Sequence, residues 1–338
     1  MMTGAQGVDQ TSPQHDVHHR ALWEKVSHSP LHNLWDFQGV PVMLVVKRTY
    51  NAFMEDNLLS RAAELGYYFL FALFPTLISA SAIFGIVARS TTLYVRLLDY
   101  LALVIPPSAM GLVMDTFNQT TKASSGGKIT FGLVAALWSA SVGFAAIQDT
   151  LNIVYKVKET RPYWKVKGAA ILVTVLLSVV VMLTLTALLG GDIVAKYMAA
   201  HIPQHATAVT VSLVIRMAGW LTAITLLILL FSIIYYYAPD VQKKVWHWLT
   251  PGAALAIFSW LVASIALRLY LHYFNSFSVT YGSLGGVIIL LTWFYVTGLM
   301  LLLGAELNSE IALSVHERQM KLEAGALETA AAARGQAA

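Results

Sequence analysis

Six long apolar segments, separated by shorter polar ones, dominate the hydrophobic pattern of the chain. They cover residues 66–88, 131–155, 168–189, 207–237, 251–274 and 283–307. A helix needs about 20 consecutive apolar residues to cross the hydrocarbon core of a bilayer. Each segment is near or above that length, so the pattern predicts an all-α fold: a polytopic transmembrane helical bundle with six membrane spans.

More polar segments surround the spans and predict the domain boundaries. Residues 1–33 are polar and His-rich without a sustained period, so we expect a disordered tail and no removable signal peptide. Residues 34–65 alternate apolar and charged positions at helical spacing, which indicates an amphipathic interfacial helix. The membrane domain then occupies 66–310, with short outer cap helices within 89–130, and a cytoplasmic tail occupies 311–338.

Composition and charge support lipid as the solvent. The chain is 57% hydrophobic and 12% charged, whereas soluble domains are about 25% charged. No cysteine is present, which excludes disulfides, thiolate catalysis and cysteine-based metal sites. Five basic residues lie between Lys156 and Lys167, after the second span. Because basic loops stay in the cytoplasm, we expect an inner-membrane protein with both termini cytoplasmic.

Small residues and prolines predict how the helices begin, bend and pack. Pro75 lies mid-span and predicts a kink, because proline lacks a backbone donor. Thr250 followed by Pro251 predicts a helix start, with the threonine as cap. Small residues at four-residue spacing allow close helix packing. They occur twice, as Ser139 with Gly143 and as Gly282 with Gly286.

Polar side chains gather toward the outer end of the fifth span. Ser264, Arg268, His272 and Asn275 share one helical face by their spacing, and Arg216 lies near the outer end of the fourth span. These residues suggest an outward-facing binding site for a phosphate or carboxylate headgroup. The alternative is that each arginine extends its long side chain to interfacial water.

A second polar set lies toward the cytoplasmic ends of the spans: Glu64, Asp149, Asn152 and Glu306. A buried carboxylate can take up and release a proton, so this set is a candidate for proton or ion coupling. The structural alternative is an inter-helix polar network that includes pairing with Arg61, Lys156 or Lys158. We expect Asp149 to be the deepest of the set.

Four sequence motifs occur in order along residues 56–311. They are GYYFLFALFPTLI, LWSASVGFAAIQDTLNIVYKVKETRPYWK, YYYAPD followed by TPGAALAIFSWL, and TYGSLGGVIILLTWFYVTGLMLLLGAELNSEI. Together they resemble the YihY/BrkB family of bacterial inner-membrane proteins. The resemblance implies a multi-pass membrane protein with six spans. Members of this family have carried the label ribonuclease BN, are linked to virulence, and in some cases are described as transporters or lipid exporters.

These observations favour a transporter or flippase-like pathway for an anionic amphiphile or a small anion. The alternative is a non-transporting membrane scaffold or envelope-integrity factor. Ribonuclease activity is not expected, because converging histidines and carboxylates of the H-x-H-x-D-H type are absent. We therefore expect no enzyme activity, cofactor, metal or nucleic-acid partner. The expected partners are membrane lipids, the substrate and further copies of the chain.

Overall fold

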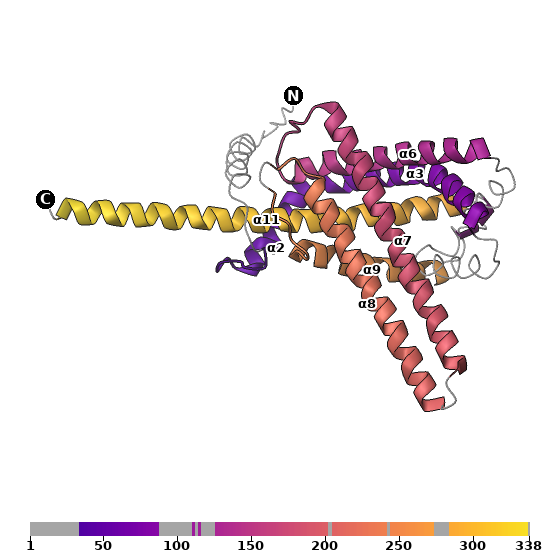
Figure 1. The fold of residues 1–338 in the computed structure, drawn as a ribbon. Coiled ribbons are helices and arrows are strands. Elements are labelled where there is room, and N and C mark those ends of the chain that lie inside the picture. Colours follow the sequence, from indigo (N-terminus) through magenta and orange to yellow (C-terminus); the bar gives the residue numbers. More distant parts are fainter. Residues whose placement is uncertain are drawn as a thin grey trace, which may run out of the picture.

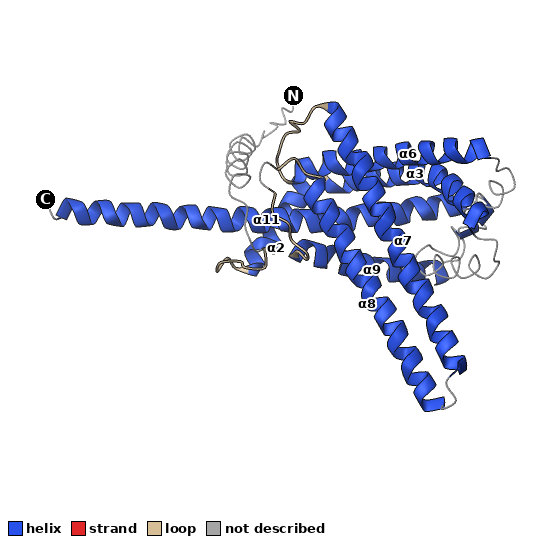
Figure 2. Ribbon diagram, in the orientation of Figure 1, coloured by secondary structure: helices blue, strands red, loops and turns tan. Residues whose placement is uncertain are grey.

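The computed structural model describes residues 34–87, 110–111, 114–115, 126–201, 205–241, 244–273 and 284–336. Within these residues every regular element is an α-helix (Figure 2). The all-α class predicted from the hydrophobic pattern is therefore confirmed. The predicted tail 1–33 and most of the predicted outer cap 89–130 lie outside the described residues.

Seven helices make up the described fold. They are α2 (Val42–Glu55), α3 (Leu58–Val87), α6 (Gly126–Val154), α7 (Tyr163–His201), α8 (His205–Tyr237), α9 (Pro251–Tyr273) and α11 (Leu284–Gln336). The start of α9 follows the predicted signal: the Thr250 hydroxyl accepts a hydrogen bond from the Ala253 backbone N–H at 3.0 Å, and Pro251 is the first helical residue.

The helices form a bundle from which one hairpin protrudes (Figure 1). Helix α11 packs along α3 and α9, and α6 packs along α3. Helices α7 and α8 pack against each other over much of their length, cross the bundle obliquely and extend beyond it. The last part of α11 projects from the opposite end of the bundle, where α2 packs against it.

Four of these helices are long and apolar enough to cross a membrane: Tyr163–Met198, Thr207–Tyr237, Pro251–Tyr273 and Leu284–Thr329. They match the last four predicted spans by length and composition. Helices α3 and α6, with 30 and 29 residues, coincide with the first two predicted spans. Whether these two also cross the membrane stays a prediction.

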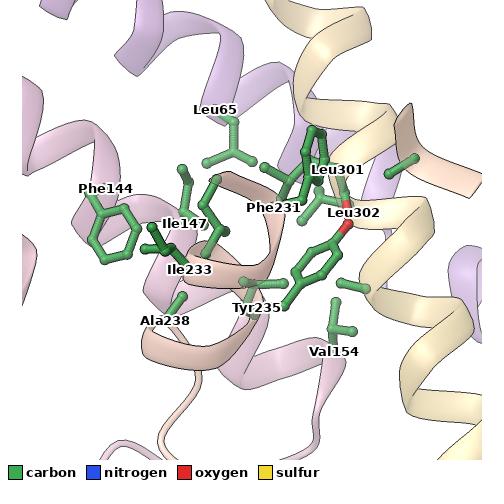
Figure 3. Packing of buried hydrophobic residues seen from close by; sticks show 14 of the residues in the cluster. Leu65, Phe144, Ile147, Val154, Phe231, Ile233, Tyr235, Ala238, Leu301 and Leu302 are labelled. Atoms are coloured by element: carbon green, nitrogen blue, oxygen red, sulfur yellow. Dashed lines mark hydrogen bonds between the residues drawn. The ribbon is translucent and has the colours of Figure 1, made fainter. Parts of the chain in front are cut away.

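The main apolar core lies where α3, α6, α8 and α11 meet (Figure 3). Leu65 of α3, Phe144 of α6 and Phe231 of α8 are buried there together with Leu302 of α11. The Tyr235 hydroxyl points into this core and donates a hydrogen bond to the Leu301 carbonyl at 2.8 Å. The Tyr235 side chain therefore links α8 to α11, and its buried hydroxyl has a hydrogen-bond acceptor.

Glycines mark the places where helix backbones approach each other most closely. Gly304 of α11 faces Gly252 of α9, and a Cβ on either residue would overlap the carbonyl oxygen of the other. A Cβ on Gly66 of α3 would lie 3.1 Å from the Tyr295 backbone nitrogen of α11. The central contacts of α11 therefore require glycine at these positions, as expected where helices pack closely in lipid.

The predicted packing residues occupy less crowded positions. Gly143 is buried, and a Cβ there would meet Phe69 Cδ1 at an ordinary contact distance of 3.8 Å. Ser139 and Gly286 are half-buried in α6 and α11, while Gly282 lies outside the described residues. Pro75 lies within α3, which runs as one helix from Leu58 to Val87.

Two predicted boundaries differ from the structure. The interfacial helix ends at Glu55, because the chain turns at Asp56 and Asn57, where Asn57 has φ +53°; residues 58–65 belong to α3. Helix α11 continues without a break past residue 311. Its next turns are buried, since Ile311 and Val315 pack against Val45 of α2.

Candidate functional site

Polar side chains converge on α11 at the point where the ends of α2, α3, α6 and α9 meet it. We refer to this group as the polar hub, and it consists of Asp56, Lys156, Glu306, Asn308, Ser309 and Glu310. The four α11 members are at most 2% exposed. Such a concentration of buried polar groups inside an apolar bundle makes the hub the leading candidate site.

Glu306 is the most unusual member of the hub. Its side chain is fully buried, and in the described structure neither carboxylate oxygen has a hydrogen-bond partner. Glu310, one helical turn further along α11, is also buried, and its Oε2 has no hydrogen-bond partner there. A buried carboxylate without a partner is costly. The two glutamates can therefore bind a proton or another cation.

Asp56 and Lys156 form an ion pair at the edge of the hub. Their side chains are 10% and 19% exposed, so the pair is largely shielded from water. Lys156 adopts φ +52°, a left-handed conformation that ends α6 and directs its side chain back toward Asp56. Both members of the pair act electrostatically on Glu306.

Asn308 and Ser309 attach two helix ends to α11. Asn308 Oδ1 accepts a hydrogen bond from the Gly252 N–H at 2.9 Å, and its Nδ2 donates to Thr250 Oγ1 at 2.9 Å. The Ser309 hydroxyl donates to the Val154 carbonyl at 2.9 Å. These contacts satisfy backbone groups that helix ends leave unpaired. They hold the start of α9 and the end of α6 against α11.

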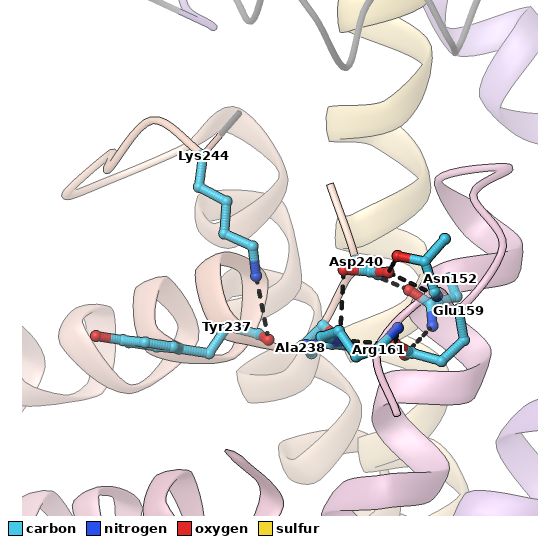
Figure 4. A network of polar contacts seen from close by, with 8 residues as sticks. Asn152, Glu159, Arg161, Tyr237, Ala238, Asp240 and Lys244 are labelled. Carbon is cyan, nitrogen blue, oxygen red and sulfur yellow. Dashed lines mark hydrogen bonds and ion pairs between the residues drawn. The ribbon is translucent and has the colours of Figure 1, made fainter. Parts of the chain in front are cut away.

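A second polar cluster, the loop clasp, links the α6–α7 loop to the end of α8 (Figure 4). It consists of Asn152, Glu159, Thr160, Arg161 and Asp240. Arg161 donates two hydrogen bonds of 2.7 Å to Glu159, and its Nε lies 3.4 Å from Asp240 Oδ1. Asn152 donates to Glu159 at 2.9 Å and accepts from the Asp240 N–H at 2.7 Å.

The clasp shifts the pKa values of its own charged groups. Burial raises the pKa of Glu159, but the hydrogen bonds from Arg161 and Asn152 outweigh burial, and the net pKa is lowered. Hydrogen bonding to Glu159 raises the pKa of Arg161. Beside the clasp, burial lowers the pKa of Lys244, which lies near Tyr237 at the end of α8. The clasp is therefore a mutually satisfied structural network.

The clasp predicts a pH-dependent stability difference between the wild type and the Glu159→Gln variant. Because the folded pKa of Glu159 is lowered, its ionised form stabilises the protein above the unfolded pKa of about 4.3. That contribution is lost as the pH falls through the folded pKa. At neutral pH we expect the variant to melt about 2 °C below the wild type. Melting curves at several pH values should show this gap closing in acid; a constant gap would contradict the prediction.

The four polar residues predicted toward the cytoplasmic ends of the spans do not form one cluster but lie at three separate positions in the fold. Glu306 belongs to the hub and Asn152 to the clasp, whereas Glu64 and Asp149 are exposed and lie 3.6 Å and 3.8 Å from Arg61. Asp149 is not the most buried member of the set, since its side chain is 71% exposed; its depth in the membrane stays a prediction. The face of α6 that turns inward carries Gln148 instead, which is 1% exposed.

The predicted outer set shows no common site among its described members. Arg216 is exposed on α8, and Arg268 and His272 are exposed on α9. The two helices separate toward the ends that carry these residues (Figure 1). Ser264 is half-buried and its hydroxyl has no hydrogen-bond partner in the described structure, while Asn275 lies outside the described residues. An anion site formed by this set stays a prediction.

Five of the six hub residues were not predicted as site residues: Asp56, Lys156, Asn308, Ser309 and Glu310. Glu310 has a usable sequence signal, because it follows Glu306 by four residues and so shares its helical face. Asp56 and Lys156 are 100 residues apart in sequence, and only the fold brings them together. The described residues contain no group of three or more His, Asp or Glu side chains that could hold a metal ion.

Comparison with known proteins places the chain among membrane proteins. The sequence model of the family described as Virulence factor BrkB matches residues 49–327. YfkH of Bacillus subtilis, a ribonuclease-like protein by name, is 32% identical over 267 residues, covering 79% of this chain and 94% of that protein. None of the solved structures matches the chain.

Two further relatives carry the name UPF0761 membrane protein. The one from Stenotrophomonas maltophilia is 26% identical over 277 residues, covering 78% of this chain and 59% of that protein. The one from Xanthomonas oryzae is 29% identical over 284 residues, covering 82% of this chain and 63% of that protein. In both cases the match spans less than two thirds of the relative's length.

Proposed function

This chain belongs to the BrkB family, and from that premise we propose that it is a transporter of the bacterial inner membrane that moves an anionic amphiphile. The bundle crosses the membrane six times, through α3, α6, α7, α8, α9 and the first part of α11. Both termini lie on the cytoplasmic side, where the basic loop between Lys156 and Lys167 also lies. The chain carries out no covalent chemistry on its substrate.

The observation that carries this proposal is the buried carboxylate of Glu306. Ionisable groups inside membrane bundles are costly, and they usually mark ion or substrate pathways. Glu306 is fully buried, and neither of its oxygens has a hydrogen-bond partner in the described structure. A side chain kept only for packing would not need a charge at this position. We therefore assign Glu306 the coupling role.

The exposed helix faces support an amphiphile as the substrate class. The outer half of the α7–α8 hairpin presents apolar side chains such as Met182, Tyr197 and Leu213 on its surface, where acyl chains can lie. Arg216 and Arg268 add positive charge to the exposed faces of α8 and α9. An acidic headgroup with apolar tails meets both features, whereas a small anion would use only the charge.

Lipid movement in reconstituted vesicles tests the proposal. The vesicles contain phosphatidylethanolamine, phosphatidylglycerol and a trace of fluorescent phosphatidylglycerol, and carry an imposed proton gradient; dithionite then reports the fraction of label in the outer leaflet. We expect the wild type to move the label faster than protein-free vesicles do. The Glu306→Gln variant should fall to the protein-free rate, because it keeps the shape of the side chain and removes its charge.

The matched control is Glu323→Gln, which changes an exposed glutamate on the same helix. It should move lipid at the wild-type rate. Fluorescent phosphatidylcholine reports whether a net negative headgroup is required. If the wild type moves neither label but accelerates phosphate uptake, the substrate is a small anion. If it moves none of the three, transport is contradicted and a scaffold role is favoured.

A further inference from the structure

We propose that Glu306 and Glu310 share one proton, and that this proton reaches the pair along a polar line on α11 through Ser314 and Glu317. This inference rests on the proposed transport function in one respect: the shared proton would couple proton movement to substrate movement. The proton-sharing site itself follows from the geometry of the hub. Glu310 thereby becomes a positioning residue for the coupling carboxylate.

The spacing of the two glutamates places them on the same face of α11, and Glu310 acts electrostatically on Glu306. They are four residues apart on one helix, which places their Cβ atoms about 6 Å apart on the same face. Both side chains are buried, at 0% and 1% exposure. Three of their four carboxylate oxygens have no hydrogen-bond partner in the described structure. Two like charges this close in a dry environment repel, and one shared proton removes the repulsion.

The charged groups around the pair leave an excess of negative charge. Glu55 and Asp56, at the end of α2, lie close enough to act on both glutamates. Lys156, after α6, acts on both as well, and Arg48 of α2 acts on Glu310. Counting the pair itself, four carboxylates face two cations. A bound proton would supply positive charge that the side chains around the pair do not provide.

Both cations are already engaged with other acidic groups. Lys156 is paired with Asp56. Arg48 Nη1 lies 2.8 Å from Glu317 Oε2 and donates a 3.3 Å hydrogen bond to the Ser314 hydroxyl. Neither cation therefore offers Glu306 a direct ion pair in the described structure. The phenol of Tyr155, which also lies near Glu306, carries no positive charge to offset the excess.

The neutral groups of the hub favour a proton over a metal cation. A metal ion needs several oxygen ligands at once. The Asn308 side chain is engaged with Gly252 and Thr250, and the Ser309 hydroxyl donates to Val154. The oxygens of these α11 residues that have no hydrogen bond in the described structure are carboxylate oxygens. Two carboxylates suit a single proton, which needs only one or two acceptors.

A line of polar side chains connects the pair to water. Glu306, Glu310, Ser314 and Glu317 follow each other at steps of four, four and three residues, so they lie on one face of α11. Ser314 is 4% exposed, whereas the Glu317 side chain is 21% exposed. Burial thus increases from Glu317 inward. Arg48 holds Ser314 and Glu317 together at the outer end of the line.

Infrared spectroscopy of the full chain in lipid nanodiscs tests proton sharing directly. A protonated carboxyl group gives a carbonyl band that shifts in D2O. We expect the wild type to show this band at neutral pH and the Glu306→Gln/Glu310→Gln double variant to lack it. In Glu310→Gln the band should keep its Glu306 contribution but follow a different pH profile. An unchanged pH profile in Glu310→Gln, or a band that persists in the double variant, would overturn the proposal.

Failure of the proton-sharing proposal and failure of the transport proposal would give different results. If the band behaves as expected but the fluorescent phosphatidylglycerol does not move in vesicles, proton sharing stands and the transport proposal falls. If the lipid moves but Glu310→Gln leaves the band profile unchanged, transport stands and proton sharing falls. Glu323→Gln serves as the folding and spectral control in both assays. Sodium added at constant pH should not displace the band; displacement would identify a metal cation as the ligand and overturn the proposal.

Discussion

Replacing Gly304 by alanine is expected to lower the free energy of unfolding by about 3 kcal/mol, at the upper end of what overpacking costs in a well-packed core. A Cβ at this position would overlap the carbonyl oxygen of Gly252. It would also lie 2.5 Å from the Tyr235 hydroxyl and 2.7 Å from Ala256 Cβ. Backbone atoms cannot move aside as a flexible side chain can, so α9 and α11 must separate.

Separation of these helices would also disturb the polar hub. The hydrogen bonds from Gly252 to Asn308 and from Asn308 to Thr250 cross the same contact. We therefore expect Gly304→Ala to lose the fixed start of α9 together with its packing. Gly252→Ala should behave alike, because its Cβ would lie 2.6 Å from the Asn308 side chain and overlap the Gly304 carbonyl.

Gly168→Ala is the matched control, since a Cβ there would meet no atom within 4 Å. Alanine is favoured over glycine inside a helix, so this variant should be more stable than the wild type by about 0.5 kcal/mol. Thermal unfolding in detergent, followed by the fluorescence of the nine tryptophans, measures all three variants. A Gly304→Ala variant as stable as Gly168→Ala would show that the helices do not meet at this residue.

Breaking the Asp56–Lys156 ion pair is the second change with a large expected effect. Lys156→Met should lower the free energy of unfolding by about 3 kcal/mol, because it leaves a shielded aspartate without its cation. The loss should be larger than for an exposed pair, because Asp56 lies beside Glu306 and Glu310. Methionine and lysine are equally disfavoured at φ +52°, so backbone strain does not contribute to the difference.

A double-mutant cycle isolates this interaction from other effects of the substitutions. Asp56→Asn combined with Lys156→Met removes both charges, and we expect the double variant to recover much of the stability lost by Lys156→Met alone. The same melting assay in detergent applies. If the two single effects simply add, the ion pair contributes nothing of its own, and the assignment of Lys156 to the hub would be incorrect.

Local signals in the sequence were sufficient for the helices and for some of their ends. The lengths of the apolar segments predicted the four spans that α7, α8, α9 and α11 provide. Thr250 and Pro251 marked the start of α9 correctly, because capping depends only on residues within one turn. The positive φ of Asn57 and Lys156 was not predicted, since this conformation is uncommon outside glycine, although asparagine adopts it more readily than lysine.

The candidate site was predictable only in part. Glu306 stood out as a charge at the end of an apolar run, but its complete burial depends on how the other helices pack around α11. The charge of Asp149 favours it over Gln148 as a site residue, but the two are adjacent in sequence and therefore face directions about 100° apart. In a helix that is apolar on nearly every side, the pattern does not say which of two neighbours turns inward.

The sequence by itself determined that this chain is an all-α membrane protein, where its apolar helices lie and which family it belongs to. These properties follow from helix length, from residue types and from motifs that are local along the chain. Only the tertiary structure decided that Gly304 meets Gly252, that Lys156 pairs with Asp56 and that Glu306 and Glu310 are enclosed together. The reason is that lipid solvates every apolar face equally, so helix rotation is decided by close packing and by polar contacts between distant segments.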